Sequence, residues 1–188
     1  MHIVSRIELE ENISYYDLIL LQQTCLSDDL PPPNRFCLEQ FSRHFNSSGP
    51  GGGLAVYYRS GYSHVGDVCK KSYQLSMFRS SDYDVICVYR SKNESRQGQI
   101  EFLTDLQKLL NSRNKIIITG DFNTDPDSSV IGKELRNWNF KQVINYPTHI
   151  EGNRIDHCYI SDKIKVEAVK ITQTPVYYSD HDKIEICV

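Results

Sequence analysis

Lys115-Ile-Ile-Ile-Thr-Gly-Asp-Phe-Asn-Thr124 is the stretch that decides the fold and supplies the first candidate site residues. Its consecutive β-branched side chains favour a buried strand, because such side chains pack well on a pleated surface. Gly120 then permits a sharp turn that brings Asp121 and Asn123 to the end of the strand, where open α/β folds bind ligands. A carboxylate and an amide there are suited to activating water against a phosphate. The same residues are also typical of an Asx turn that merely ends a strand, so the rest of the chain must decide.

The size of the chain and its charge limit the classes of protein to which it can belong. With 188 residues, 39% of them hydrophobic, the chain is expected to form one globular domain over residues 1–188. Its formal net charge of -3 argues against a generally basic surface, so any polyanion would bind in a local groove. The sequence shows neither a leader with an apolar core nor a membrane-spanning stretch. We therefore expect an intracellular protein without a membrane partner.

Six cysteines are scattered along the chain without any Cys-x-x-Cys pair, which argues against a structural zinc site built on cysteine. Several of them lie within apolar, strand-like segments. We predict buried free thiols in a reducing compartment rather than disulfides. The cysteines are Cys25, Cys37, Cys69, Cys87, Cys158 and Cys187.

Hydrophobic periodicity predicts an alternation of helices and strands, which is typical of the α/β class. Helices are predicted over residues 4–13, 97–112 and 130–138, with a short one over 37–45. Strands are predicted over residues 17–22, 54–58, 73–78, 83–89, 140–144, 154–160, 166–172 and 184–188, besides the central strand that begins at Lys115. The prolines at 31–33 mark a loop. The glycines at 51–53 are interpreted as a turn, since the lysine of a Walker motif is absent.

Two further groups of residues are suited to phosphate chemistry. Asp156 lies within an otherwise apolar strand, where a buried carboxylate needs a partner. His181 is a candidate for that partner, because an imidazole oriented by a carboxylate is suited to work on a phosphate. Tyr89 and Arg90 end another predicted strand, and both side chains could reach phosphate oxygens. Taken alone, each group is also compatible with packing or with a surface turn.

Taken together and in order, these motifs resemble the endonuclease/exonuclease/phosphatase superfamily, which has the deoxyribonuclease-I-like fold. The motifs that carry the resemblance are Leu21-Gln-Gln-Thr24, Gly52-Gly-Leu-Ala55, Tyr89-Arg90, Gly120-Asp-Phe-Asn123, Ile155-Asp156 and Ser179-Asp-His181. Three others look most like the endonuclease domains of non-long-terminal-repeat retrotransposons and Helitron-type elements. These are Tyr146-Pro-Thr-His149, Arg154-Ile-Asp-His157 and Tyr178-Ser-Asp-His-Asp182.

The resemblance implies a four-layered α/β sandwich with two packed mixed sheets and a catalytic site at one end. It implies that Asp121 and Asn123 position and activate the attacking water. It further implies that His181, oriented by Asp156, assists at the phosphate and that Tyr89 contacts the phosphate. The activity expected from this set is metal-dependent hydrolysis of DNA, in which an oxygen-bound cation neutralises charge on the phosphate.

The metal site departs from the family pattern. The resemblance assigns metal binding to Asp180 and to the glutamate of a Leu-Gln-Glu-Thr motif. In this chain the position of that glutamate is occupied by Gln23. A carboxamide offers an oxygen without charge, so Mg²⁺ or Mn²⁺ should bind weakly. We assign Arg90 and Thr148 to substrate binding.

A second departure is expected upstream: the resemblance places Met1 already inside the family's first helix, so we expect the family's first strand and its asparagine to be missing. A missing strand exposes a sheet edge, so we expect a homodimer or another partner to cover it. DNA is the expected substrate, and the resemblance suggests a nuclear or viral setting. The alternative functions are an inactive descendant that binds nucleic acid or protein, and a phosphoesterase acting on lipid or nucleotide phosphates.

Overall fold

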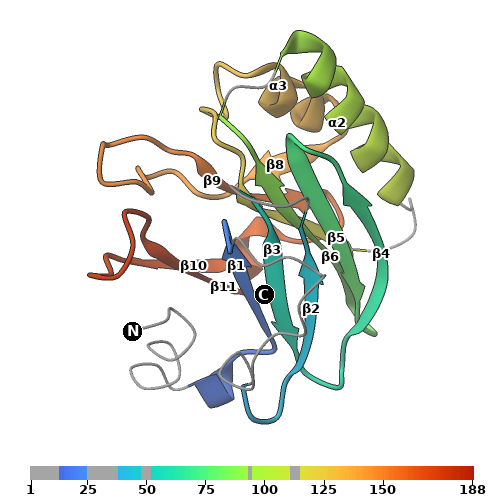
Figure 1. The fold of residues 1–188 in the computed structure, drawn as a ribbon, viewed down its shortest axis with the longest axis vertical. Coiled ribbons are helices and arrows are strands. Elements are labelled where there is room, and N and C mark those ends of the chain that lie inside the picture. The colour runs from blue at the N-terminus through green and yellow to red at the C-terminus, as the bar shows by residue number, and fades with distance from the viewer. Residues whose placement is uncertain (1–12, 25–37, 48–51, 93–94, 111–114) are drawn as a thin grey trace.

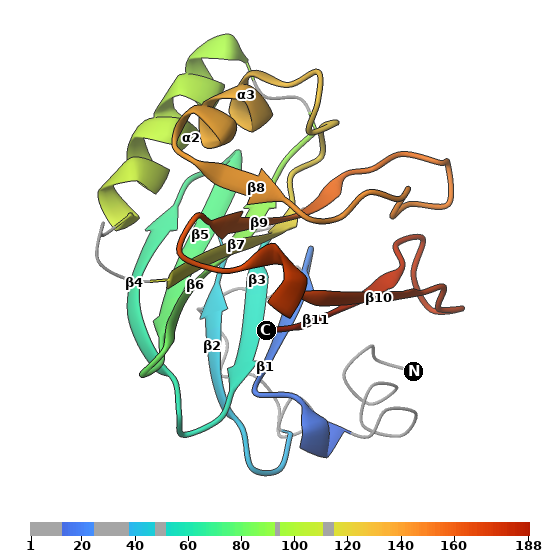
Figure 2. The same cartoon turned by 180° about the vertical axis from the view of Figure 1, so that it is seen from behind.

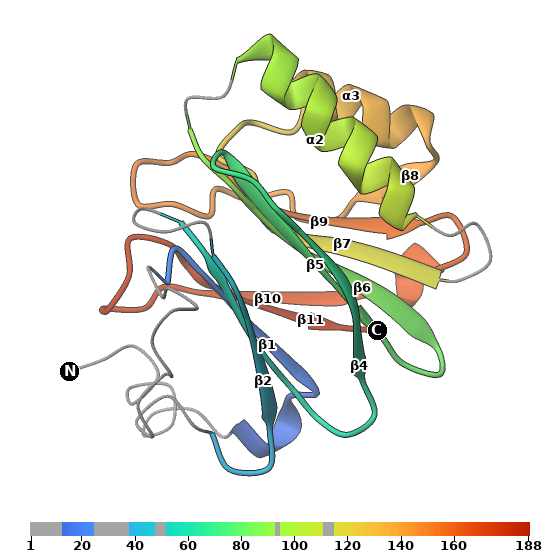
Figure 3. The same cartoon turned by 45° about the vertical axis from the view of Figure 1, so that its right-hand side comes forward.

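The computed structural model describes residues 13–24, 38–47, 52–92, 95–110 and 115–188. A six-stranded sheet in the order β4-β5-β6-β7-β9-β8 packs against a three-stranded sheet, β1-β3-β2, and a two-stranded sheet, β10-β11 (Figure 1). The two α-helices cover the other face of the six-stranded sheet (Figure 3). The elements are η1 (Ile13–Tyr15), β1 (Leu18–Gln22), β2 (Ser42–Asn46), β3 (Leu54–Tyr58), β4 (Ser63–Cys69), β5 (Tyr73–Arg79), β6 (Tyr83–Arg90), α2 (Arg96–Leu109), β7 (Lys115–Asp121), α3 (Val130–Asn137), β8 (Phe140–Gln142), β9 (Asp156–Ser161), η3 (Val166–Ala168), β10 (Lys170–Thr174) and β11 (Lys183–Cys187).

Strand β7 is central because both of its faces are covered. It pairs in parallel with β6 and antiparallel with β9. Ile116 and Ile118 pack into the core beneath the helices, whereas Ile117 packs into the core between the sheets. This alternation is the two-residue period of a strand. The run of isoleucines therefore supplies both cores, and Asp121, which is an even number of residues beyond Ile117, belongs to the face between the sheets.

Gly120 is required by the close approach of β7 to β6. Its φ of +142° lies in a region that side chains disfavour, and a Cβ atom there would lie 2.0 Å from the carbonyl oxygen of Val88. No side-chain rearrangement could relieve this contact, because the obstacle is backbone. The glycine fixes how Asp121 leaves the strand.

Most of the strands predicted from periodicity are present, with differences at particular elements. Residues 42–45, predicted as the end of a short helix, lie in β2, and β4 was not predicted at all. Residues 166–168 form the 3-10 turn η3, so that β10 begins at Lys170. The predicted helix over residues 4–13 lies almost wholly outside the described residues, and the proline loop at 31–33 lies entirely outside them. No helix in the described part of the chain is long and apolar enough to cross a membrane.

Three of the four layers that the resemblance implies lie within the described residues. Over the described ranges, no α-helix covers the outer face of β1-β3-β2, so those ranges form three layers (Figure 2). Within the same ranges, β1 pairs with β3 alone. The Tyr16 hydroxyl, just before β1, donates to the Glu185 carboxylate on β11 and so connects the two smaller sheets. A partner on the sheet edge stays a prediction.

None of the described cysteines forms a disulfide, as predicted, but only half of them are buried. Cys87 and Cys158 lie in the core between the sheets, where burial raises the pKa of the Cys158 thiol to about 12 and that of Cys87 still further. Cys69 and Cys187 are exposed. Cys25 and Cys37 lie outside the described residues.

Candidate functional site

Strand pairing places three of the predicted site residues in one row. Tyr89 on β6 is the register partner of Asp121 on β7, and Asp121 is the partner of Asp156 on β9. Side chains at directly paired positions lie on the same face of a sheet, close enough to interact. All three residues are buried, at 3%, 1% and 7% exposure respectively. The row lies on the face between the sheets, at the end where β7 runs into its turn.

Asn123 holds the Asp121 carboxylate in a fixed orientation. Its backbone N–H donates to Asp121 Oδ1 over 2.8 Å, and its side-chain Nδ2 donates to Oδ2 over 2.9 Å. The same Nδ2 atom donates to the backbone carbonyl of Arg90 over 2.7 Å. This arrangement requires a left-handed backbone at Asn123, with φ of +49°, which asparagine tolerates better than most residues. The Asx turn expected from the sequence is therefore present, and it orients the candidate general base.

His181 is oriented by Asp156, as the sequence predicts. Its Nδ1 atom lies 2.8 Å from Asp156 Oδ2, so the other ring nitrogen is left for substrate. The hydrogen bond to Asp156, strengthened by the charges of neighbouring carboxylates, raises the pKa of His181 to about 8. The imidazole is therefore mostly protonated near neutral pH and can stabilise negative charge.

Asp121 is suited to act as a base, whereas His181 is suited to act as an acid. Desolvation by burial and the nearby charge of Asp156 together raise the pKa of the Asp121 carboxyl to about 7. A carboxylate with a pKa near the working pH is suited to accept a proton from water. The site thus contains a candidate base and a candidate acid, each with a shifted pKa, and such pairs are common in enzymes.

A pocket of about 350 Å³ opens beside these groups. It is lined by Gln23, Lys92, Asn123, Thr124, Asp125, His149, Glu151, Asn153, Ile155, Asp180 and His181. Gln23 therefore lies at the same rim as Asn123, as expected, and its Nε2 atom donates to the Tyr89 hydroxyl over 3.4 Å. Asp180 lies with its carboxylate 3.4 Å from His149 Nε2. The pocket thus brings both predicted metal-binding residues together with Asn123 and His181, whereas Asp121, Asp156 and Tyr89 lie buried behind its lining.

The groups around the pocket fit a divalent cation, although incompletely. Asp180, His149 and His181 place ligand atoms within 4.8 Å of one another. The raised pKa of Asp121 also indicates negative charge that the protein alone does not fully balance. Gln23 and Asp180 would hold a cation through oxygen atoms, but only Asp180 contributes charge. A hard ion such as Mg²⁺ would therefore be held weakly.

The two residues assigned to substrate binding are buried beside the site, and their role in binding substrate stays a prediction. Arg90 is 3% exposed, and its guanidinium donates to the Phe122 carbonyl over 2.7 Å. Thr148 is 0% exposed, and its hydroxyl accepts the backbone N–H groups of Ile155 and Asp156 over 3.2 and 3.0 Å. Both side chains satisfy backbone groups beside the site, which is a positioning role.

His149 is the most informative pocket residue that sequence reasoning left without a role. A β-bridge joins residues 149 and 181, and the two imidazole rings lie 4.9 Å apart with an edge-on geometry. His149 stands in the Tyr-Pro-Thr-His motif, but nothing in the sequence indicates that this loop pairs with the loop that carries His181. The same holds for Lys92 and Glu151, which also line the pocket.

Comparison with protein-family models gives one match, to the Endonuclease/Exonuclease/phosphatase family over residues 4–181. No curated protein sequence matches the chain. Among solved structures, an AP endonuclease from Archaeoglobus fulgidus superposes with a TM-score of 0.75 at 16% identity, covering 99% of this chain and 92% of that one. A 3'-5' exonuclease from Neisseria meningitidis gives a TM-score of 0.73 at 16% identity over 97% and 94% of the two chains.

A mobile-element protein is also among the structural neighbours. The endonuclease domain of TRAS1, a telomere-specific non-long-terminal-repeat retrotransposon, gives a TM-score of 0.70 at 9% identity. The match covers 100% of this chain and 92% of that domain. At such identities these likenesses establish the deoxyribonuclease-I-like α/β fold and no more. The fold expected from the ordered motifs is confirmed.

Proposed function

The chain belongs to the endonuclease/exonuclease/phosphatase family, and on this premise we propose that it hydrolyses phosphodiester bonds of DNA as a metal-dependent nicking endonuclease. The observation that supports the proposal is the pairing of Asp121 with Asp156 directly behind a pocket that their hydrogen-bond partners Asn123 and His181 line. Nuclease or phosphatase activity is what the family indicates. The DNA substrate and the nicking reaction are the proposed part.

In the proposed mechanism, each of the chain's own residues acts on a stated atom. Asp121, held by Asn123, accepts a proton from the attacking water. Protonated His181, held by Asp156, donates a hydrogen bond to a phosphate oxygen as charge develops there. The Tyr89 hydroxyl, at the end of the row, contacts the same phosphate. A divalent cation held by Gln23 and Asp180 would neutralise charge on the phosphate oxygens.

DNA is favoured over a small phosphate ester by the surroundings of the pocket. The loops between β8 and β9 and between β10 and β11 project on the same side of the molecule (Figures 1 and 2). They carry Tyr146, Ile150 and Tyr177, which are 66%, 83% and 73% exposed. Exposed aromatic rings beside a phosphate-binding pocket suit stacking on bases, and Lys92 adds a positive charge to the pocket lining. A DNA substrate agrees with the nuclear location that the resemblance suggests.

Gln23 favours a second candidate function, a binding module without catalytic activity. Because its amide carries no charge, the cation site has lost part of its electrostatic affinity while the pocket stays open. Such a protein would bind DNA, a partner protein or a second copy through the same surface and leave the phosphodiester bond intact.

A plasmid-nicking assay distinguishes the two functions. Supercoiled DNA is incubated with wild type, Gln23→Glu and His181→Ala over a series of Mg²⁺ and Mn²⁺ concentrations, with Gln97→Glu as the matched control on the exposed face of α2. We expect weak wild-type nicking, roughly tenfold faster nicking by Gln23→Glu at limiting metal, and none by His181→Ala.

The opposite outcome is equally informative. If neither wild type nor Gln23→Glu nicks DNA with either metal, the nuclease proposal is refuted. DNA retention in a gel-shift assay by the same preparations would then support the binding module. Equal gains from Gln23→Glu and Gln97→Glu would show that added charge in general, rather than charge at the metal position, changes the activity.

A further inference from the structure

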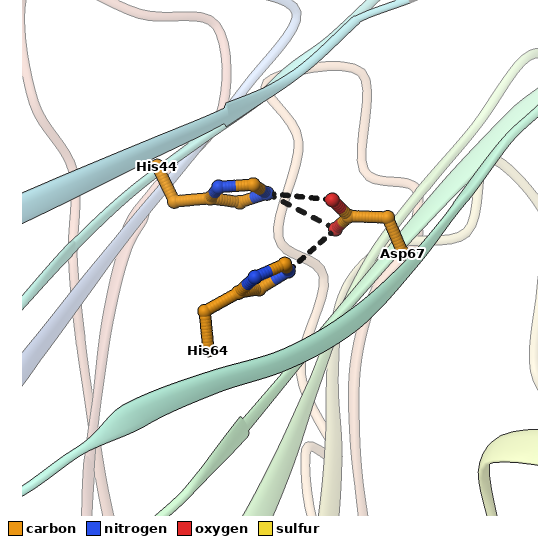
Figure 4. A group of neighbouring side chains, drawn as sticks. All are labelled: His44, His64 and Asp67. Carbon is orange, nitrogen blue, oxygen red and sulfur yellow. Dashed lines mark hydrogen bonds and ion pairs between the residues drawn. The ribbon is translucent and has the colours of Figure 1, made fainter.

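A second cluster of metal-ligating side chains lies away from the pocket. His44 on β2 and His64 and Asp67 on β4 converge, as Figure 4 shows. The Nε2 atom of His44 lies 2.8 Å from Asp67 Oδ2, and that of His64 lies 3.0 Å from Oδ1. None of the three residues lines the catalytic pocket. The cluster is therefore separate from the proposed nuclease site.

The two imidazole rings are arranged as a pair of ligands rather than as independent surface side chains. Their centroids are 3.8 Å apart with an angle of 24° between the planes, and both present Nε2 to the same carboxylate. An imidazole binds a cation through a nitrogen that has given up its proton, so zinc binding here would release the protons that face Asp67. Ligand atoms around a tetrahedral zinc ion lie about 3.3 Å apart, given bonds of about 2.0–2.1 Å. The observed separations of 2.8 and 3.0 Å need only a small opening.

The carboxylate of this cluster is supported from behind. The Ser76 hydroxyl donates to Asp67 Oδ1 over 2.7 Å. The side-chain amide of Asn46, which is 4% exposed, approaches the same oxygen at 3.4 Å and is itself anchored on the Leu75 carbonyl over 2.8 Å. Hydrogen bonds of this kind hold ligating carboxylates in orientation in metal sites. The Asp67 carboxylate is thus positioned before any ion arrives.

The place of the cluster in the fold suggests what an ion there would do. Strand β2 is an edge strand of the three-stranded sheet and β4 is an edge strand of the six-stranded sheet. Both imidazole rings contact the ring of Phe78, with centroid distances of 5.9 Å for His44 and 5.4 Å for His64. Phe78 belongs to the core between the sheets. The ligand side chains remain 22–30% exposed, which leaves room for water as a fourth ligand.

We propose that His44, His64 and Asp67 form a zinc site that joins the two sheets at their open edge. Two imidazoles and one carboxylate suit Zn²⁺ and neighbouring late first-row cations, whereas Mg²⁺ and Ca²⁺ prefer oxygen ligands alone. This site differs from the catalytic cation position assigned to Gln23 and Asp180, which offers oxygen ligands, and it stabilises the packing of β2 on β4. Its three ligands come from both sheets, so zinc binds the folded chain far better than the unfolded one.

The test is a zinc titration of metal-free, full-length protein against a chromophoric chelator. His149→Gln serves as the background, because it removes a ligand from the other cluster of histidines and carboxylate at the pocket. In that background we expect each chain to bind one equivalent of zinc. An equal concentration of Mg²⁺ should not displace the bound zinc. Adding His64→Gln or His44→Gln should weaken zinc binding by at least about 100-fold, and Ser76→Ala by about 10-fold.

Thermal unfolding gives a second measurement that does not depend on activity. Zinc should raise the Tm of the His149→Gln protein and leave that of His149→Gln/His64→Gln unchanged, because only the former holds the ion in its native state. His64 is on the surface, so its replacement should leave the fold intact, and His44→Gln provides a second variant. Less than one equivalent in the His149→Gln background, or equal affinity with and without His64, would overturn the proposal and leave the cluster as a hydrogen-bonded contact only.

Discussion

Replacing Asp121 by asparagine should stabilise the protein while abolishing its proposed catalysis. Burial and the charge of Asp156 raise the pKa of the Asp121 carboxyl from 3.8 to about 7. Because the pKa of Asp121 is higher in the folded than in the unfolded state, the contribution of this carboxyl to the free energy of unfolding is fully present below pH 3.8. That contribution is lost as the pH rises through 7. At about 1.36 kcal/mol per pKa unit, ionised Asp121 destabilises the fold by up to about 4 kcal/mol.

Asparagine removes the charge and keeps an acceptor oxygen for the Asn123 backbone N–H. It also presents an amide group to Asn123 Nδ2, and the hydrogen bond lost there is worth about 1 kcal/mol. The net gain for Asp121→Asn above pH 7 should therefore be about 2–3 kcal/mol. Near pH 4 the gain should fall toward zero or reverse, because the wild-type carboxyl is then neutral in the folded protein.

Urea denaturation in metal-free buffer at pH 4, 6 and 8 measures this dependence, with the m-value as a check that the unfolded states are comparable. Asp162→Asn, at an exposed position, is the matched control and should change the free energy of unfolding little at any pH. A variant no more stable than wild type at pH 8, or a gain that is equal at pH 4 and pH 8, would show that Asp121 is not held against its ionisation.

Three other substitutions test the surroundings of the site. Gly120→Ala should cost more than about 3 kcal/mol of unfolding free energy, because its Cβ would lie 2.0 Å from the Val88 carbonyl oxygen, whereas Gly61→Ala, with open space around it, should be nearly neutral in the same denaturation assay. Thr148→Val leaves two buried backbone N–H groups without their acceptor and should cost about 2–4 kcal/mol in thermal or urea unfolding, with a loss of nicking; unchanged stability would contradict its positioning role. Burial lowers the pKa of His157 to about 4, so the stability that its neutral form contributes is complete above pH 6.5 and falls by up to about 3 kcal/mol as pH drops through 4. His157→Phe should therefore unfold less steeply with acid than wild type, and parallel acid-unfolding curves for the two proteins would contradict this prediction.

The fold was predictable where burial governs the sequence and unpredictable where it does not. The β-branched run of β7 and the leucines of α2 identify their elements because each must fill a core. Strand β4 carries mostly exposed side chains at the edge of its sheet, and so it has no apolar alternation to detect. Strand β2 is similarly polar, because His44 contributes to an inter-sheet cluster rather than to the apolar core.

The site was predictable as a set of residues more than as a set of contacts. The pairing of Asp156 with His181 followed from the need of a buried carboxylate for a partner. The inward orientation of Arg90 could not be predicted. It depends on a hydrogen bond to the backbone carbonyl of Phe122, and a backbone carbonyl leaves no signal in the sequence. The approach of His149 to Asp180 likewise depends on a bridge between two loops, which only tertiary structure reveals.

The row formed by Tyr89, Asp121 and Asp156 is complete only after its three strands have been synthesised and have paired. These residues and His181 come from segments widely separated along the chain, and each of the three strands meets its neighbour in a single register. During synthesis, Asp121 and Asn123 leave the ribosome well before the segment that carries His181, so a nascent chain holds the base without its acid. A slip of one residue between β7 and β9 would turn the Asp156 carboxylate toward the helices. Unfinished or misregistered chains would thus carry no complete site.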